Sequence, residues 1–409
     1  MSAEDSIRWL PVGEVGDVRM GKQLSPTSRA NGEQFPYLRV ANVLDGRIDY
    51  SDVKLMGFTQ SEREAYALQP GDILLNEGQS LELVGRSAIY RGPAAAFFFQ
   101  NTLVRFRARD LVLPEYAQAV FSRWLSTGVF ASIAKKTTSI AHLGGDRFAK
   151  LLFPVRSLTE QQRIVEALAA FAEAERALEG SISKLRILRR GAHLSLMSAV
   201  DAHGVASKSW SRVPLKDVVP STEYGISEAL VNDPSGVPVL RMNNLQNGQP
   251  DVTDLRYCPV SIPQRLYLKR GDVLFNRTNS IDHVGKAALW REELPTASFA
   301  SYLVRLNPDS EKLLPEYLVE WLQHPVIRQR VRAISTVAVQ QVNVNPTRLR
   351  ELEIDFPSDL AEQRRIVSTL ASFDDRIGRE VEELAKLRRL KQGLTDDLLS
   401  GRVRVPEVA

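Results

Sequence analysis

The chain carries one ordered set of sequence blocks twice. The blocks recur in the same order, first between residues 38 and 165 and again between residues 240 and 367. In the first copy they are Leu38–Asn42, Gly71–Asn76, Val84–Arg86, Leu103–Arg105, Leu113–Tyr116 and Glu160–Val165. In the second copy they are Leu240–Asn244, Gly271–Asn276, Val284–Lys286, Leu303–Arg305, Leu314–Tyr317 and Glu362–Val367. Chance similarity would not keep so many blocks in order, so the sequence predicts a duplicated unit with a shared scaffold and different loops.

Bulk properties limit the class of protein without deciding it. With 409 residues the chain can form two or more domains, each with its own core. Its one cysteine, Cys258, excludes an internal disulfide framework and fits a reducing compartment. A polar N-terminal segment and the lack of an apolar stretch of about 20 residues predict a cytoplasmic protein. The net charge of +4 is small, so any nucleic-acid surface must come from locally clustered charges.

The first part of each copy has the pattern of a mixed α+β fold. Short apolar runs such as Asp72–Leu75 and Thr102–Phe106 are bounded by Gly, Pro and Asn, which is typical of strands. Helices are expected after Pro114 and Pro315, because proline suits the first helical position and apolar residues follow at helical spacing.

Each copy ends in a segment that predicts one long amphipathic helix. Ser157 and Asp359 are N-cap residues with glutamate three positions later, which is the capping-box pattern. Each helix is expected to run for about 40 residues, or roughly 60 Å. The apolar stripe contains Ile164, Leu168, Phe171, Leu178, Ile182, Leu185, Ala192 and Leu196 in the first copy, and Ile366, Leu370, Phe373, Ile377, Leu384, Leu387, Leu394 and Leu398 in the second.

Such a stripe must be buried, and two arrangements are possible. Each helix could pack on its own globular domain, or the two stripes could pair. Pairing is favoured, because the spacing stays near 3.5 residues over several heptads. The expected fold is therefore two similar α+β domains separated by a long antiparallel two-helix coiled coil, with an approximate two-fold axis.

Sequence motifs give no support to an enzyme. The chain contains no phosphate-binding loop, dinucleotide-binding glycine turn, nucleophile elbow or zinc-protease helix motif. Asp72 and Asp272 follow glycine at a strand entry, where a carboxylate usually accepts hydrogen bonds from its own turn. The five histidines lack metal-ligand spacing, so structural or solvent roles are favoured for His142, His193, His203, His283 and His324.

Polar loop segments at equivalent places in the two copies are candidates for DNA contact. Arg suits guanine, Asn or Gln suits adenine and Glu suits cytosine, while basic and hydroxyl side chains suit phosphate. The candidates are Asn76, Gln79, Ser80, Arg86, Lys135, Lys136, Thr137 and Thr138 in the first copy, and Asn276, Arg277, Thr278, Asn279, Lys286, Arg332, Gln340, Gln341 and Asn343 in the second. Ordinary solvated loops remain an alternative, and for Arg39, Asn42, Arg241 and Asn244 a structural turn is at least as well supported.

Taken together, the repeated blocks resemble the DNA specificity subunit of type I restriction–modification systems. Each block is weak alone, but the ordered set appears twice, each time before a long helix, and covers nearly the whole chain. The resemblance implies two target-recognition domains (1–156 and 204–357), two conserved helices (157–203 and 358–400) and a tail (401–409). Each domain would recognise one half of a split site in double-stranded DNA, and the paired helices would set the spacer.

The resemblance also implies partners, and it leaves the chemistry to them. Two modification (methyltransferase) subunits would dock on the helices and carry S-adenosylmethionine. In the full complex, restriction subunits would use ATP with magnesium. This chain itself would hold no cofactor, no metal and no catalytic residue.

Three alternatives remain open at this point. The subunit could serve a modification-only or fused cutting enzyme. The duplicated unit could be a protein-binding scaffold without DNA contact. An enzyme in its own right is the least favoured.

Overall fold

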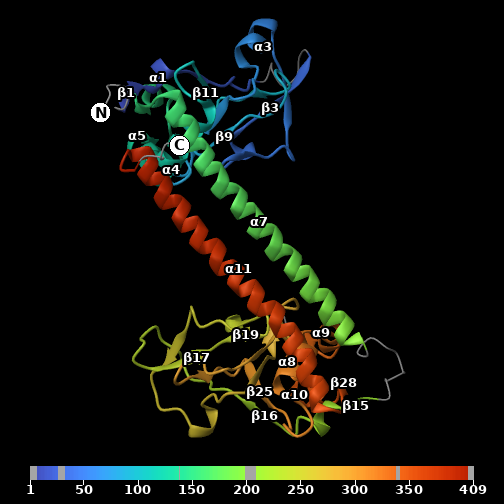
Figure 1. Ribbon diagram of the computed structural model, residues 1–409. Helices are drawn as coiled ribbons and strands as arrows, with labels where there is room; N and C mark the ends of the chain where they lie inside the picture. The colour runs from blue at the N-terminus through green and yellow to red at the C-terminus, as the bar shows by residue number, and fades with distance from the viewer. Residues whose placement is uncertain (1–6, 26–32, 138, 199–208, 338–340, 404–409) are drawn as a thin grey trace, which may run out of the picture. The chain divides into compact units, whose positions relative to one another are not determined.

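A computed structural model describes residues 7–25, 33–137, 139–198, 209–337 and 341–403 (Figure 1). The chain divides into two compact units. The first unit is residues 1–179 with 382–409, and the second unit is residues 180–381. Each unit therefore contains one repeat and a segment of the other repeat's long helix.

The first unit contains fourteen strands, five short helices and a 3₁₀ turn in its described residues. Its strands are β1 (Arg8–Pro11), β2 (Gly16–Met20), β3 (Gln34–Leu38), β4 (Val43–Leu44), β5 (Arg47–Ile48), β6 (Lys54–Gly57), β7 (Ile73–Asn76), β8 (Gly78–Gln79), β9 (Ser87–Ile89), β10 (Phe98–Phe99), β11 (Leu103–Ala108), β12 (Lys135–Lys136), β13 (Ala141–His142) and β14 (Leu152–Val155). Its short helices are α1 (Val12–Val15), α3 (Gln60–Tyr66), α4 (Pro114–Ser126), α5 (Val129–Ile133) and α6 (Gly145–Ala149), and the turn is η2 (Val40–Asn42).

The second unit follows the same plan. Its strands are β15 (Trp210–Pro214), β16 (Ser221–Tyr224), β17 (Val237–Leu240), β18 (Leu245–Gln246), β19 (Gln249–Pro250), β20 (Arg256–Cys258), β21 (Val273–Asn276), β22 (Thr278–Asn279), β23 (Ala287–Leu289), β24 (Ser298–Phe299), β25 (Leu303–Asn307), β26 (Thr336–Val337), β27 (Val342–Asn343) and β28 (Glu353–Pro357). Its short helices are α8 (Pro315–Gln323), α9 (Pro325–Ala333) and α10 (Pro346–Arg350), with turns η4 (Leu215–Asp217), η5 (Met242–Asn244) and η6 (Gln264–Leu266).

The sheets of the two units correspond one for one, which confirms the predicted duplication and the mixed α+β fold. A four-stranded antiparallel sheet has the order β2-β11-β7-β9 in the first unit and β16-β25-β21-β23 in the second. A three-stranded sheet has the order β10-β3-β6 in one and β24-β17-β20 in the other. The predicted helices α4 and α8 both begin with proline at the first helical position.

Two of the repeated sequence blocks are joined by a buried glutamine in each unit. The amide of Gln161 accepts a hydrogen bond from Leu113 N at 2.8 Å and donates to Leu111 O and Arg156 O at 2.8 and 2.9 Å. Gln363 makes the equivalent three bonds in the second unit. Both side chains are fully buried. The bonds hold the start of the long helix against the segment that begins α4 or α8, which explains why these blocks recur together.

The Gly-Asp turns have the structural role that the sequence predicts. Asp72 accepts a hydrogen bond from Gln69 N at 2.8 Å, and Asp272 accepts one from Lys269 N at 2.9 Å. Each carboxylate also binds an arginine of the neighbouring strand, Arg107 in the first unit and Arg305 in the second. These ion pairs could not be predicted, because the arginines are not at equivalent positions.

The two long helices are α7 (Leu158–Leu196) and α11 (Leu360–Ser400) (Figure 1). Their 39 and 41 residues confirm the predicted length. Ser157 Oγ accepts from Glu160 N at 3.2 Å, and Asp359 Oδ1 accepts from Ala361 N at 2.8 Å, so both expected N-caps are present. In the first copy the reciprocal bond of the capping box is replaced, because Glu160 binds Arg156.

In the first unit, the start of α7 and the end of α11 pack together on the globular domain. Ile164, Leu398 and Leu399 are buried in the same hydrophobic core. Beyond that core, Glu175 binds Lys391 at 2.9 Å and Glu179 binds Arg388 at 2.5 Å. Residue numbers rise along α7 as they fall along α11, so the helices are antiparallel within this unit.

The second unit has the complementary arrangement. Ile366 and Leu370 of α11 enter its core, and Met197, just past the end of α7, packs in the same cluster. Arg189 of α7 bridges Asp374 of α11 and Glu320 of α8, both at distances near 3 Å. Each domain thus packs against the beginning of its own helix and the end of the other.

The predicted apolar stripe is buried unevenly along the two long helices. Among the predicted pairing residues, Ile164, Leu185, Ile366, Leu370 and Leu384 are buried, whereas Leu168, Phe171, Leu178, Phe373, Ile377 and Leu387 are half-buried. Both long helices therefore pack on the domains, and within each unit ion pairs also join α7 to α11. Within the described part of the chain, no helix has the length and hydrophobicity needed to cross a membrane.

Candidate nucleic-acid interface

A small three-stranded sheet joins the two polar segments of the first unit. Its strand order is β12-β13-β8, with Lys135 paired to His142 and Gln79 paired to Ala141. The segments around residues 79 and 136 are far apart in the sequence, and this sheet brings them to one place. We call it the first hairpin sheet.

The second unit has a matching sheet, which we call the second hairpin sheet. Its order is β22-β27-β26, with Asn343 paired to both Thr278 and Thr336. In each unit the first strand of the hairpin sheet, β8 or β22, comes one residue after a central strand of the four-stranded sheet, β7 or β21. The shared scaffold therefore presents two polar hairpins of different sequence.

The side chains of the hairpin sheets differ in exposure. Lys135, Lys136, Thr137 and Gln341 are exposed, and Gln79, Asn279 and Asn343 are half-buried. These remain candidates for DNA contact. Thr138 and Gln340 lie outside the described residues.

Three of the predicted DNA-contact residues have buried side chains, so they are no longer candidates for DNA contact. Asn76 and Asn276 end the central strands β7 and β21 with fully buried side chains, and Asn276 Nδ2 donates to Met242 O at 3.2 Å. The side chain of Thr278 is also buried. The sequence prediction was wrong here because these residues belong to the sheet, although their polar character suggested a loop.

The remaining candidates lie beside the hairpin sheets along the chain. Ser80 accepts a backbone bond from Val84 N and starts the turn that leads to half-buried Arg86. Lys286 is bonded to Gln246 at 2.9 Å, and burial lowers the pKa of its ammonium group. Arg332 is exposed near the end of α9. None of these three basic side chains belongs to a hairpin strand.

One pair of interacting side chains lies at each hairpin sheet, and only the pair of the second unit consists of predicted contact residues. In the first unit His142 Nδ1 lies 3.0 Å from Glu77 Oε2. In the second unit Arg277 Nη2 donates to Asn343 Oδ1 at 3.1 Å. The sequence favours a structural or solvent role for His142, and Glu77 is not among the predicted DNA contacts. Aligning Glu77 with Arg277 across the repeats would have drawn attention to this position.

The Arg-Asn blocks form structural turns, as the sequence suggested. Asn42 is buried and donates to Asp49 O and Asp52 O at 2.9 and 3.1 Å. Asn244 makes the same two bonds to Asp251 O and Asp254 O.

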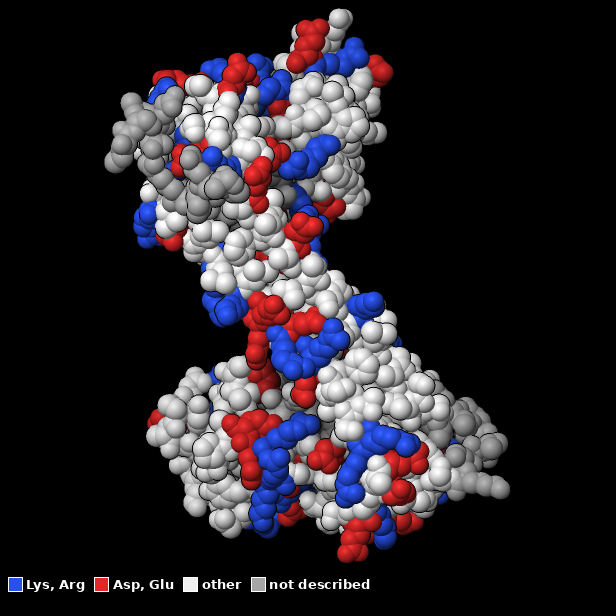
Figure 2. All heavy atoms as spheres, viewed as in Figure 1, with Lys and Arg blue, Asp and Glu red and all other residues white. Residues whose placement is uncertain are grey.

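Charge over the visible face of the molecule is mixed. Figure 2 shows basic and acidic side chains interspersed on both units, with no single basic field covering this face. Any attraction for nucleic acid on this face must therefore arise from small groups of side chains.

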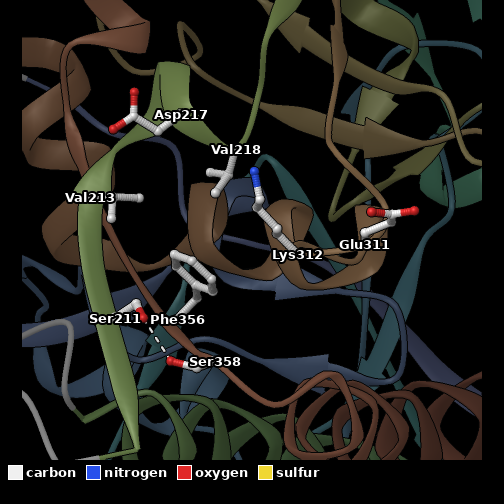
Figure 3. A pocket seen from close by; sticks show the side chains of 8 residues that line it. All are labelled: Ser211, Val213, Asp217, Val218, Glu311, Lys312, Phe356 and Ser358. Atoms are coloured by element: carbon white, nitrogen blue, oxygen red, sulfur yellow. Dashed lines mark hydrogen bonds between the residues drawn. The ribbon is translucent and has the colours of Figure 1, made fainter.

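A cavity of about 340 Å³ lies in the second unit near β15, β28 and η4 (Figure 3). Its lining contains Ser211 and Ser358, whose hydroxyl oxygens are 2.6 Å apart, together with Asp217, Glu311 and Lys312. No histidine or cysteine lines it. Among the described residues, no group of three His, Cys, Asp or Glu side chains could hold a metal ion.

Comparison with known proteins agrees with the duplication. The family model "Type I restriction modification DNA specificity domain" matches residues 9–185 and again 207–389. Because these matches cover most of the chain, the protein belongs to this family of DNA specificity domains.

The chain is also similar to individual proteins and solved structures. The chain is 28% identical over 200 residues to the putative type I restriction enzyme MjaX specificity subunit of Methanocaldococcus jannaschii, a match covering 48% of this chain and 47% of that relative. A chain from a solved type I R-M system has a TM-score of 0.62 at 20% identity, covering 97% of this chain and 98% of that one. The type I S subunit from M. genitalium has a TM-score of 0.53 at 14% identity, covering 100% and 98%. These two structures share the fold.

Proposed function

We propose that this chain is the non-catalytic DNA specificity subunit of a type I restriction–modification complex. Each unit would recognise one half of a split DNA site. The observation that carries the proposal is the pair of hairpin sheets, which present different polar side chains from equivalent positions of two matching scaffolds in a chain of this family. A protein that recognises two different half-sites needs this combination of constant framework and variable contacts.

The proposal assigns the chemistry to partner subunits. Two modification subunits would bind S-adenosylmethionine and methylate the DNA, and restriction subunits would use ATP with magnesium. The long helices are the proposed docking surface, because Ile187, Leu188 and Leu390 on them are exposed apolar side chains. The proposed location is the cytoplasm, and the free thiol of Cys258 fits a reducing compartment.

We infer that α7 and α11 form an antiparallel coiled coil that sets the distance between the half-sites. The ion pairs between α7 and α11 support this idea, because residue numbers rise along α7 as they fall along α11 in the first unit. One heptad is about 10 Å of helix, which corresponds to about three base-pair steps of DNA. Removing a heptad also rotates the following residues only slightly about the helix axis, because seven residues are nearly two full turns.

Deleting residues 176–182 from α7 together with 383–389 from α11 is therefore expected to shorten the preferred spacer by about three base pairs. The measurement is mapping of methylated bases in cells that carry this chain and its methyltransferase partner. Inserting one heptad in both helices is the matched control and should lengthen the spacer. An unchanged spacer in both variants would refute the ruler function.

Exposed lysines of the first hairpin sheet provide a test of DNA contact itself. Replacing Lys135 and Lys136 by alanine should make the slope of log affinity against log salt about 1.8 less negative, since each phosphate contact contributes about −0.9. The measurement is binding of a labelled duplex by the complex with its methyltransferase partner at several salt concentrations. Lys150→Ala, an exposed lysine outside the sheet, is the control. Equal slopes for all three proteins would favour a protein-binding scaffold.

A further inference from the structure

Glu77 in the first unit and Arg277 in the second occupy equivalent backbone positions, and their side chains have opposite charges. Glu77 N donates to Thr102 O, and Glu77 O accepts from Leu143 N. Arg277 N donates to Tyr302 O, and Arg277 O accepts from Val344 N. Both residues directly follow the buried asparagine that ends the central strand. The two positions are therefore equivalent, and only the side chains differ.

The partner of each side chain also comes from an equivalent position. His142 belongs to β13 and Asn343 belongs to β27, the middle strands of the two hairpin sheets. The first unit thus presents a carboxylate–imidazole pair, and the second presents a guanidinium–amide pair. Each pair joins the residue between the central strand and the hairpin sheet to the middle strand of that sheet, so each has a fixed position on the scaffold.

Each pair keeps unused hydrogen-bonding capacity. Arg277 uses one N–H of Nη1 on Ser301 O and one of Nη2 on Asn343, which leaves one N–H on each terminal nitrogen. Its guanidinium lies 5.1 Å from the ring centroid of Tyr224, a side chain that is 49% exposed. Glu77 binds His142 through Oε2, and Oε1 accepts no bond from the described residues. The second unit therefore offers paired donors, whereas the first offers an acceptor.

The charges around the two pairs compensate for this difference. At the outer edge of the first hairpin sheet, strand β12 carries Lys135 and Lys136. At the outer edge of the second, the equivalent strand β26 carries the uncharged Thr336 and Val337. The hairpin strands counted together with Glu77 or Arg277 therefore carry a formal charge of +1 in each unit. Both hairpin sheets can therefore attract the phosphate backbone of DNA. The side chain at position 77 is negative, whereas the side chain at the equivalent position 277 is positive.

We propose that Glu77 with His142 and Arg277 with Asn343 are the base-discriminating pairs of the two units. Paired N–H donors of arginine match the O6 and N7 acceptors of guanine in the major groove. A carboxylate accepts from an exposed amino group, which only cytosine and adenine present there. The second half-site therefore contains a guanine recognised by Arg277, and the first contains a cytosine or adenine recognised by Glu77. This assignment rests on the proposed function.

Exchanging the pairs tests the assignment. The variants are Glu77→Arg with His142→Asn, and Arg277→Glu with Asn343→His, each in the complex with its methyltransferase partner. The measurement is selection of bound sequences from random duplex DNA. In the first variant, one position of the first half-site should change to guanine by about tenfold to hundredfold, and the second half-site should not change. The second variant should lose a guanine from the second half-site only.

Two milder variants cover the case in which an exchanged pair fails to fold. Arg277→Lys keeps the charge but loses the paired donors, so preference for guanine should fall about tenfold at that position. Glu77→Gln should weaken selection at one position of the first half-site. Glu64→Arg is the control, because it reverses an exposed charge on α3 and should leave both half-sites unchanged.

The outcomes separate this assignment from the proposed function. Selected sequences that stay the same in all pair variants overturn the assignment, while recognition by the complex stands. A wild-type complex that selects no sequence overturns the proposed function and the assignment together.

Discussion

Replacing Leu398 and Leu399 by alanine is expected to destabilise the first unit by about 4–10 kcal/mol, since each buried leucine contributes about 2–5 kcal/mol. Both side chains are 2% exposed in the core of that unit, although they lie near the end of the sequence. Arg156 Nη2 also donates to Leu398 O at 2.7 Å. A loss of this size approaches the whole stability of an ordinary domain.

The effect should be confined to one unit, which hydrogen exchange followed by mass spectrometry can resolve. Peptides covering β11 should lose protection, whereas peptides covering β25 should keep it. Leu390→Ala is the matched control, because Leu390 of the same helix is 54% exposed. Equal protection of β11 in the double variant and the control would contradict the packing of α11 on the first repeat.

Replacing Gln161 by leucine is expected to destabilise the first unit by about 3–9 kcal/mol. Leucine has a similar size but cannot bond Leu113 N, Leu111 O or Arg156 O. A buried backbone group without a partner costs about 1–3 kcal/mol. The measurement is the denaturant midpoint of the unfolding transition that reports on the first unit.

The neighbouring residue supplies the control for this variant. Gln162 is exposed and bonds only to Glu166 on the same helix face. Gln162→Ala should therefore change the midpoint little, within about 0.5 kcal/mol. Similar midpoints for both variants would show that the glutamine is not the link between the two repeated blocks.

The helices show which part of the fold the sequence determines by itself. Capping residues, proline positions and apolar spacing are local signals, so the N-caps at Ser157 and Asp359 and the starts of α4 and α8 were predictable. The partner of an apolar stripe is not local information. Periodicity identified Leu398 as buried, but nothing in the pattern indicated that it packs in the core of the first repeat.

The candidate interface was predictable as two regions and not as individual contacts. Polar composition identified both segments of each hairpin sheet, yet it could not separate buried Asn76 from exposed Lys135. That distinction depends on sheet register, which places Asn76 opposite Leu103 in the central sheet. Register also brings Glu77 next to His142, and their separation of 65 residues hides the pair from any local pattern.

The most direct test of the central claim is selection of bound sequences from random duplex DNA by the wild-type chain in complex with its methyltransferase partner. Two matching units with different hairpin sheets should select two different half-sites separated by a spacer of constant length and no base preference. Selection of one continuous site, or of no sequence at all, would contradict recognition by two separate units.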